Sequence, residues 1–382
     1  MGGQSLWWDE SLSLQRANYN LPLVLSNEIV LTDTSRQVIT FDNHPPLYFL
    51  LLHFMVKLAG QSEFALRFPS LVFSVLTVSL LYAVGKRLFN QQVGLLAALF
   101  GAISPLYLWY SHEARMYTML TFLGLLSFYS LLRILTQYQR PSDHPTKDHL
   151  TTILYILSSA AMLATHYLSS LILLAELVVF LSFLLKTGRR PEPCPEVPPE
   201  LDEGPRRRAA EGWRRVAIPV IGVLLIAAPI LYYGFSILPK GEMAGFRFIP
   251  LLELLRDVSN SFSLGISVST ERVLAVHWVF RAVFLIGSVS IIWRTFRRPP
   301  TLRPGSGQAS NLQPFDQAQG RPPISNIQYP TSNFQYPISH KPLSALIYLL
   351  VPILAIYLLS YVRPAYMNIR HLIMVSPAFY LI

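Results

Sequence analysis

Charged residues are scarce in this chain: Asp, Glu, Lys and Arg make up only 14% of its 382 residues, while hydrophobic residues make up 52%. Because soluble domains carry about 25% charged residues, this composition excludes an ordinary soluble domain. The one cysteine, Cys194, excludes an internal disulfide. The sequence also lacks a Cys/His cluster with zinc spacing, a Walker-type loop and a Gly-x-Ser-x-Gly motif, so a metal hydrolase, an ATPase and a serine hydrolase have no support.

Long apolar runs are present instead, and they predict an all-α polytopic membrane protein. A helix needs about 18 or more apolar residues to cross the hydrocarbon core of a bilayer. Such runs centre on residues 69–85, 92–110, 116–136, 150–165, 167–185, 216–236, 278–293 and 343–361, and a last one begins at Leu372.

The net charge of +10 does not indicate a nucleic-acid partner, because the basic residues gather in alternate loops. This distribution instead predicts the orientation of the helices in the membrane. By the positive-inside rule those loops are cytoplasmic. The outward segments are then Asp9–Glu10, 111–117, 166–167, 237–277 and 361–371. This assignment requires residues 45–59, a short apolar stretch with His53 and Lys57 on one face, to form a helix in the outer interface rather than a span.

Composition divides the chain into five expected regions. They are an N-terminal transmembrane region with the first outer loop and the candidate catalytic residues, 1–186; a flexible cytoplasmic linker, 187–215; a transmembrane region with outer loop 237–277, 216–298; a disordered, repeat-bearing cytoplasmic insertion, 299–341; and C-terminal transmembrane segments, 342–382. Because the chain begins inside an outer loop and ends inside an apolar run, we expect it to be a fragment of a longer protein.

The strongest candidate for chemistry is the acid pair Asp9-Glu10, which follows Trp7-Trp8. Tryptophan favours the headgroup level of a membrane, so the pair is expected at the bilayer surface. Adjacent carboxylates repel each other, which raises one pKa unless a cation or hydrogen bonds intervene, and a raised pKa suits a general base. The alternative is an acidic turn that caps a helix beginning near Ser11.

Two further outward segments carry arginines that suit a phosphate. Glu113 and Arg115 open the span near Met116, where both can point into a common cleft and the arginine can bind phosphate bidentately. Arg363, Arg370 and His371 precede the last run and suit a lipid phosphate. Helix capping and interfacial anchoring are the alternatives for both groups.

Three other polar residues are candidates with simpler alternatives. His44 is fixed in place by the Pro45-Pro46 pair that follows it, and His166 marks an outward turn; each of them could instead be purely structural. Glu176 lies within a span, where it serves either helix packing or the handling of protons or cations.

Together these residues predict transfer of a group from a lipid phosphate. Arginines would hold the phosphate leaving group while a carboxylate deprotonates an acceptor hydroxyl. Asp9, Glu10 and Glu113 could also share a divalent cation, so metal dependence stays open. A transporter or flippase of lipid-linked sugars is the alternative, although such a protein is expected to carry polar residues along a central path.

The chain resembles the membrane glycosyltransferases of the family 39 type, of the GT-C fold, which include protein O-mannosyltransferases and the aminoarabinose transferase of lipid A. The resemblance rests on motifs spread over nearly the whole chain in the family's order, namely residues 4–10 (QSLWWDE), 44–48 (HPPLY), 63–70 (EFALRFPS), 111–117 (SHEARMY), 165–167 (THY) and 370–372 (RHL).

This resemblance implies a GT-C type transmembrane helix bundle with outer-face interfacial helices. It also implies an inverting transfer of a sugar from a polyprenyl-phosphate donor to a lipid, glycan or protein acceptor, outside the cell membrane and without nucleic acid. Asp9 matches the family's catalytic acid, Glu10 its partner, and Glu113 and Arg115 the second outer loop. The remaining matched positions, with less defined roles, are His44, Tyr117, His166, Arg370 and His371.

The loop assignment makes a direct prediction about orientation. Single cysteines at Ser111, Tyr167 and Gly241, in a Cys194→Ala background, should react with an impermeant maleimide on intact cells, because the basic loops alternate with these positions. A cysteine at Gly305 should stay unlabelled, and its labelling would contradict the topology.

Overall fold

The computed structural model describes residues 5–33, 36–42, 44–139, 145–187, 218–223, 225–230, 232, 248–266, 274–296, 341–362 and 368–382. Cys194, Arg363, Gly241 and nearly all of the expected linker and insertion lie outside these residues.

Helices make up most of the described chain, as predicted. They are α1 (Trp8–Ala17), α2 (Leu21–Ser26), α3 (Leu47–Ala59), α4 (Glu63–Leu88), α5 (Gln91–Ile103), α6 (Pro105–Ser111), α7 (Tyr117–Gln139), α8 (Pro145–Leu163), α9 (Ser170–Thr187), α11 (Leu251–Leu264), α12 (Leu274–Phe296), α13 (Lys341–Val362) and α14 (Ser376–Leu381). Short 3-10 helices are η1 (Tyr167–Ser169), η5 (Ile369–His371) and η6 (Ile373–Val375). A two-stranded antiparallel hairpin, β1 (Glu28–Asp33) and β2 (Arg36–Phe41), was not predicted.

Within the described residues, five helices are long and apolar enough to cross a membrane: α4, α7, η1 with α9, α12 and α13. The chain is therefore a multi-pass membrane protein. Large apolar side chains remain exposed along these helices, as on α12, where Ile286 is 70% exposed. Lipid tails can cover such side chains, whereas water would make their exposure costly.

The predicted span at residues 92–110 is broken. Helices α5 and α6 together pass the test for a span, but they meet at an angle of 55°. The reason is local: Pro105 disfavours helical geometry in the preceding residue, and Ser104 has an extended backbone with ψ 120°. The Ser104 hydroxyl then caps α6 by accepting a hydrogen bond from the Tyr107 N–H.

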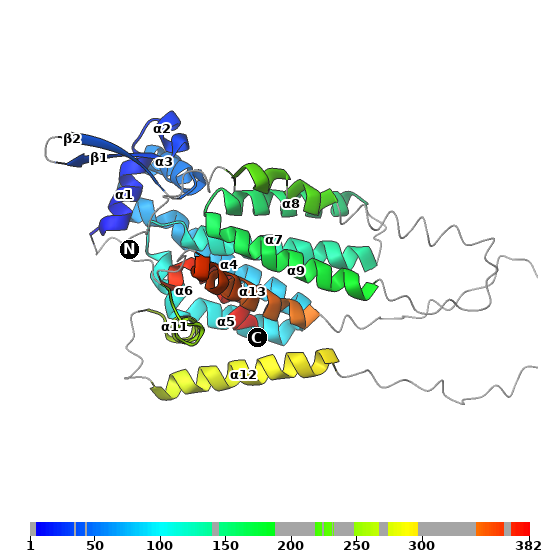
Figure 1. The fold of residues 1–382 in the computed structure, drawn as a ribbon. Helices are drawn as coiled ribbons and strands as arrows, with labels where there is room; N and C mark the ends of the chain where they lie inside the picture. The colour runs from blue at the N-terminus through cyan, green and yellow to red at the C-terminus, as the bar shows by residue number, and fades with distance from the viewer. Residues whose placement is uncertain are drawn as a thin grey trace, which may run out of the picture.

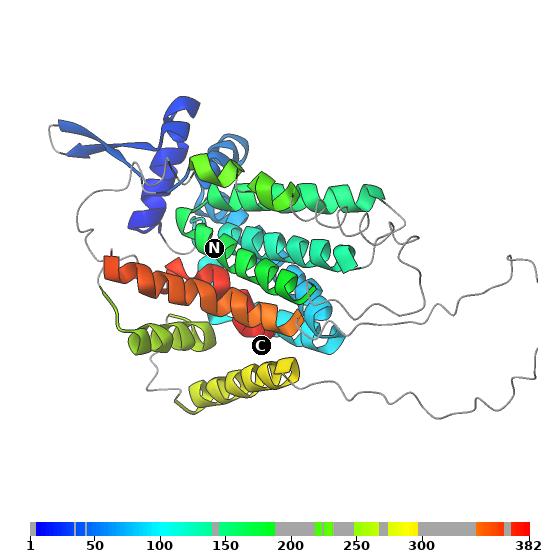
Figure 2. The same ribbon diagram turned by 45° about the vertical axis from the view of Figure 1, so that its right-hand side comes forward.

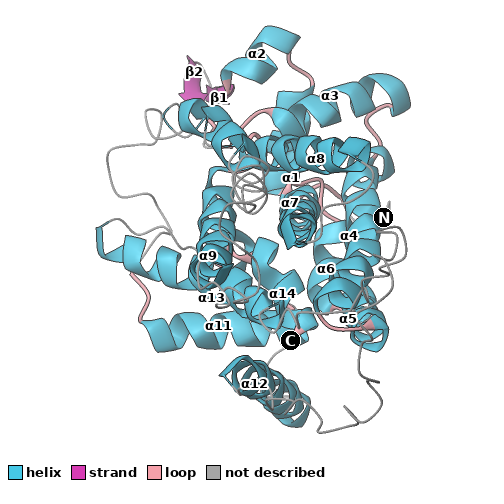
Figure 3. Cartoon of the chain, turned by 90° about the vertical axis from the view of Figure 1, so that its right-hand side faces the viewer, coloured by secondary structure: helices cyan, strands magenta, loops and turns pink. Residues whose placement is uncertain are grey.

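The spanning helices lie side by side as a bundle, with α7 in its interior (Figure 3). Helix α7 packs mainly on α4 and α8, and it is the most buried of the five candidate spans, while α12 at the edge is the least buried. The elements α1, α2, α3 and the hairpin gather at one end of the bundle, where α6 and α11 also lie (Figures 1 and 2). That end carries the candidate site.

Helix α3 has only 13 residues, which agrees with the expectation that residues 45–59 do not cross the membrane. It packs against α1, α2 and α4. His53 is buried and its Nδ1 lies 2.8 Å from the Ala17 carbonyl oxygen, whereas Lys57 is exposed. The run from Leu372 folds as η6 and α14, both buried within the bundle.

The contact between α4 and α5 requires glycine. A Cβ atom at Gly94 would lie 2.6 Å from the Tyr82 carbonyl oxygen and 2.8 Å from the Lys86 nitrogen, both in the backbone of α4. Small residues let membrane helices approach this closely.

We therefore expect Gly94→Ala to lower the free energy of unfolding by about 1–3 kcal/mol, because backbone atoms cannot yield as side chains do. Gly222→Ala is the control, since its Cβ would meet only the flexible Ile156 side chain. Thermal unfolding in detergent measures both, and equal stability of the two variants would contradict the expectation.

Candidate functional site

The acid pair lies in the first turn of α1, which begins at Trp8 and has Trp7 as its N-cap. The helix thus begins earlier than the position near Ser11 that the capping alternative gave it. Glu10 does cap this helix, because its Oε2 accepts a hydrogen bond from the Trp7 N–H at 3.4 Å. Successive residues of a helix point about 100° apart, so the two carboxylates diverge and meet different partners.

Glu10 is fully buried in a network of hydrogen bonds. Its Oε1 accepts from Arg67 Nε at 2.9 Å and from the Ala114 N–H at 2.8 Å, and its Oε2 accepts from Arg67 Nη2 at 2.7 Å. Burial alone would raise the pKa of Glu10, but the bonds and charge of Arg67 and the Ala114 N–H hold it below its ordinary value. The expected repulsion is thus offset by a cation, which favours the ionised form of Glu10.

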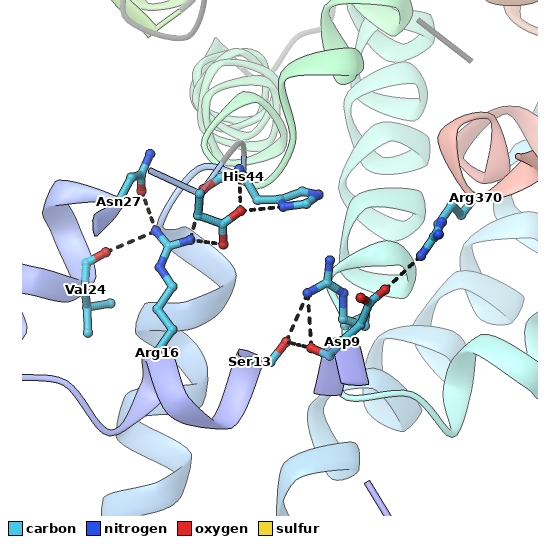
Figure 4. Close-up of polar contacts among 9 residues, drawn as sticks. Asp9, Ser13, Arg16, Val24, Asn27, His44 and Arg370 are labelled. Atoms are coloured by element: carbon cyan, nitrogen blue, oxygen red, sulfur yellow. Dashed lines mark hydrogen bonds and ion pairs between the residues drawn. The ribbon is translucent and has the colours of Figure 1, made fainter. Parts of the chain in front are cut away.

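Asp9 points the other way, toward the C-terminal part of the chain (Figure 4). Its Oδ2 lies 2.9 Å from Arg370 Nη1, in a partly exposed ion pair between residues 361 positions apart. Asn368 orients the arginine by accepting from its Nε at 2.9 Å. The first outer loop and the last described segment therefore meet at this pair.

Arg115 does not point into a cleft with Glu113 but lies behind Asp9. Its Nη1 donates to the Ser13 hydroxyl at 3.2 Å and to the Asp9 carbonyl oxygen at 3.4 Å (Figure 4). The guanidinium is buried, and among the described residues it forms no ion pair with a carboxylate. The Arg115 guanidinium carbon lies 6.0 Å from the centre of the Tyr117 ring.

Glu113 occupies the wall of a cavity. Its Oε1 accepts from the Trp109 indole N–H at 2.6 Å. Burial, aided by the charge of Glu10, raises the pKa of Glu113 to about 7, against the lowering effects of Trp109 and of the two nearby arginines. Glu113 is thus a carboxyl group that changes protonation near neutral pH.

The cavity has a volume of about 1000 Å³ and lies between the outer segments. Its walls combine charged groups with aromatic and aliphatic side chains. The lining residues are Ser5, Trp7, Glu10, Arg67, Pro105, Leu108, Trp109, Tyr110, His112, Glu113, Ile266, Asn368, Ile369 and Arg370. A charged site with an apolar wall suits an amphiphilic ligand.

The three candidate histidines cluster beside this network. The His44 and His166 rings lie 5.3 Å apart, and those of His166 and His371 6.4 Å apart. Burial, together with the charges of His44 and His371, holds the pKa of His166 well below its ordinary value, so His166 is neutral. His44 is oriented by Asp42, whose carboxylate lies 2.7 Å from His44 Nδ1.

Asp42 in turn pairs with a buried arginine from α1. Arg16 Nη1 lies 2.7 Å from Asp42 Oδ2, and Arg16 also donates to the Asn27 side chain and to the Val24 carbonyl oxygen (Figure 4). Burial would raise the pKa of Asp42, but His44 and Arg16 lower it strongly. These contacts hold the outer segments together around His44.

No group of three or more metal-ligating side chains is placed to hold an ion within the described part of the chain. Glu10 is committed to Arg67 and Asp9 to Arg370. The residues present thus do not fit the cation that Asp9, Glu10 and Glu113 were considered to share.

Comparison with known proteins bears on the fold of the chain. Residues 43–191 match the family model of dolichyl-phosphate-mannose-protein mannosyltransferases. The structure is similar to that of ArnT from Cupriavidus metallidurans in the apo state, with a TM-score of 0.56, 14% identity, and coverage of 98% of this chain and 54% of that one. The form of ArnT bound to undecaprenyl phosphate gives a TM-score of 0.55, 14% identity, and coverage of 99% and 55%.

The chain shares the fold of ArnT, and over residues 43–191 it is similar to the dolichyl-phosphate-mannose-protein mannosyltransferases. It spans about half the length of the solved structures it matches. A search of curated proteins gives no significant match. The GT-C bundle expected from the sequence is thereby confirmed.

Sequence reasoning missed several residues of this candidate site. Arg67 was predicted only as part of the motif at residues 63–70. A charged residue at the start of a span needs a partner, so Arg67 could have been paired with an acid from the sequence. Trp109 and Asn368 carry no pattern that marks them, because their roles depend on contacts made only in the folded chain.

The Glu10–Arg67 pair makes a prediction about stability. Arg67→Met should lower the free energy of unfolding by about 3–5 kcal/mol, because it leaves a buried carboxylate without its cation. Arg294→Met, at an exposed position on α12, is the control. Adding Glu10→Leu to Arg67→Met should recover part of the loss, and a double variant less stable than the single one would contradict this account.

Proposed function

We propose that this protein transfers a sugar from a polyprenyl-phosphate donor to an acceptor hydroxyl on the outer face of the membrane, with inversion at the sugar carbon. The observation that carries the proposal is the cavity wall, where the Arg370 guanidinium lies beside carboxylates and apolar side chains. The similarity to ArnT bound to undecaprenyl phosphate supports a ligand of this kind.

Arg370 is the group best placed to bind the donor phosphate. It is held from one side by Asp9 and Asn368, so its orientation is set before a ligand arrives. Its side chain is partly exposed and lines the cavity. Guanidinium groups bind phosphate through paired hydrogen bonds, which stabilise the charge that develops on the leaving group.

The apolar wall of the cavity suits the donor's lipid tail near the phosphate. Trp7, Leu108, Trp109 and Ile266 line the cavity and are each more than 40% exposed. Their side chains thus extend from the cavity to the surface of the bundle. A polyprenyl tail can leave the site along such a surface and enter the bilayer without exposure to water.

The test is binding and turnover of a polyprenyl-phosphate donor by the full chain in lipid nanodiscs. Arg370→Lys should weaken binding of undecaprenyl phosphate roughly 10- to 100-fold, because lysine keeps the charge but loses the paired contact. Arg294→Lys, at the exposed end of α12, should bind normally.

Two results would contradict the proposal. The first is unchanged binding in Arg370→Lys. The second is movement of a labelled polyprenyl-phosphate sugar across the membrane without transfer to any acceptor, which would favour the transporter.

A further inference from the structure

The end of the bundle away from the candidate site also carries arginines. Helix α4 begins at the outer end, where Arg67 pairs with Glu10, and Arg87 follows Arg67 by 20 residues. At a rise of 1.5 Å per residue, Arg87 lies about 30 Å further along the helix, which matches the thickness of the hydrocarbon core. Arg87 is therefore at the headgroup level of the opposite membrane surface.

Arg133 on α7 reaches the same level and lies close to Arg87. It follows Arg115, which lies just before α7 at the outer end, by 18 residues. Helices α4 and α7 pack against each other, and the Arg87 guanidinium carbon lies 5.9 Å from the centre of the Tyr129 ring of α7. Tyr129 and Arg133 are four residues apart, so they share one face of α7. We call Arg87, Tyr129 and Arg133 the arginine cluster.

The two positive charges of the cluster repel each other without a compensating anion in the described part of the chain. The charge of Arg133 acts on that of Arg87. Neither arginine forms a hydrogen bond or an ion pair with a described residue. The acidic residues whose side chains are described belong to the outer elements, apart from Glu176, which accepts a hydrogen bond from Tyr155 inside the bundle (Figure 1).

The Arg87 guanidinium is available end-on. Its Nε is enclosed without a hydrogen-bond partner, but its two terminal nitrogens are not enclosed in this way, and the side chain as a whole is partly exposed. The terminal nitrogens of a guanidinium can donate paired hydrogen bonds to two oxygens of one phosphate. Arg133 is partly exposed as well, so both cations can reach a ligand from outside the bundle.

We infer that the arginine cluster binds the phosphate group of an anionic lipid in the leaflet opposite the candidate site. Such a phosphate would neutralise two cations that repel each other, beside hydrocarbon that strengthens the attraction by excluding water. A lipid is favoured over free phosphate because the cluster lies at headgroup depth on two spanning helices. Tyrosine also prefers this depth, which suits Tyr129.

The orientation predicted from the sequence places this lipid in the cytoplasmic leaflet. The cluster is separated from the outer cavity by the thickness of the membrane. Lipid binding there is independent of the transfer proposed at the cavity.

The experiment measures binding of phosphatidylglycerol and of phosphatidylcholine to the full chain in detergent micelles, by native mass spectrometry over a series of lipid concentrations. Two arginines near an anionic headgroup should make the wild type bind phosphatidylglycerol roughly 10- to 30-fold more tightly than phosphatidylcholine. Equal binding of the two lipids would overturn the inference.

Substitutions by lysine separate a built site from general attraction between a basic surface and anionic lipid. Arg87→Lys and Arg133→Lys keep the charge but lose the paired contact, so each should weaken phosphatidylglycerol binding roughly tenfold. Arg294→Lys, at an exposed position near the end of α12, is the matched control and should bind as the wild type does. Thermal unfolding in phosphatidylcholine micelles checks that the variants are folded, and folded Arg87→Lys and Arg133→Lys variants that bind normally would overturn the site.

Two further arms identify the ligand and its place. Inorganic phosphate in large excess should leave phosphatidylglycerol bound, whereas its displacement would assign the cluster to free phosphate and overturn the lipid. Arg370→Lys should leave phosphatidylglycerol binding unchanged, since Arg370 lies at the other end of the bundle. Loss of that binding in Arg370→Lys but not in Arg87→Lys would place the lipid in the outer cavity and overturn the inference.

Discussion

The outer part of this protein depends on one buried ion pair, between Glu10 of α1 and Arg67 of α4. The pair joins the first outer loop to a spanning helix, and the Ala114 N–H adds the second outer loop to the same carboxylate. Two charges removed from water must be fully bonded to be tolerated, and here every oxygen of the carboxylate has a donor. The pair therefore fixes the position of the first turn of α1 and the direction in which the Asp9 side chain points.

Once Glu10 is committed, three acidic groups acquire three different environments. Glu10 is buried and bonded to a cation, and Asp9 is partly exposed beside Arg370. Glu113 is buried, and its carboxylate accepts a hydrogen bond from the indole of Trp109. Groups of one chemical type whose pKa values are pushed apart by their surroundings are suited to separate tasks. The three carboxyl groups are thus chemically distinct.

Much of the fold followed from the apolar runs and from the charge pattern, because both reflect the bilayer rather than particular contacts. The span expected at 92–110 is broken where Pro105 bends the chain. The hairpin was missed although its strands, EIVLTD and RQVITF, are rich in β-branched residues and only two polar residues separate them, which is a strand signal. At the site, the motifs located Asp9 and Arg370 but not their partnership. Pairing across 361 residues depends on tertiary packing, which one sequence does not show.

Arg115 does not line the cavity, but its charge adds to the electrostatic potential of the site. Arg67 and Arg370 each have a carboxylate partner, whereas Arg115 is buried and, among the described residues, is not paired with one. A buried cation without a counterion creates a positive potential, and that potential is strong because little water screens it. Arg115 and Arg370 both contact Asp9, the first at its carbonyl oxygen and the second at its carboxylate, so this charge lies close to the arginine proposed to bind phosphate. An incoming phosphate would supply the missing negative charge, so the site without ligand is already complementary to an anionic donor.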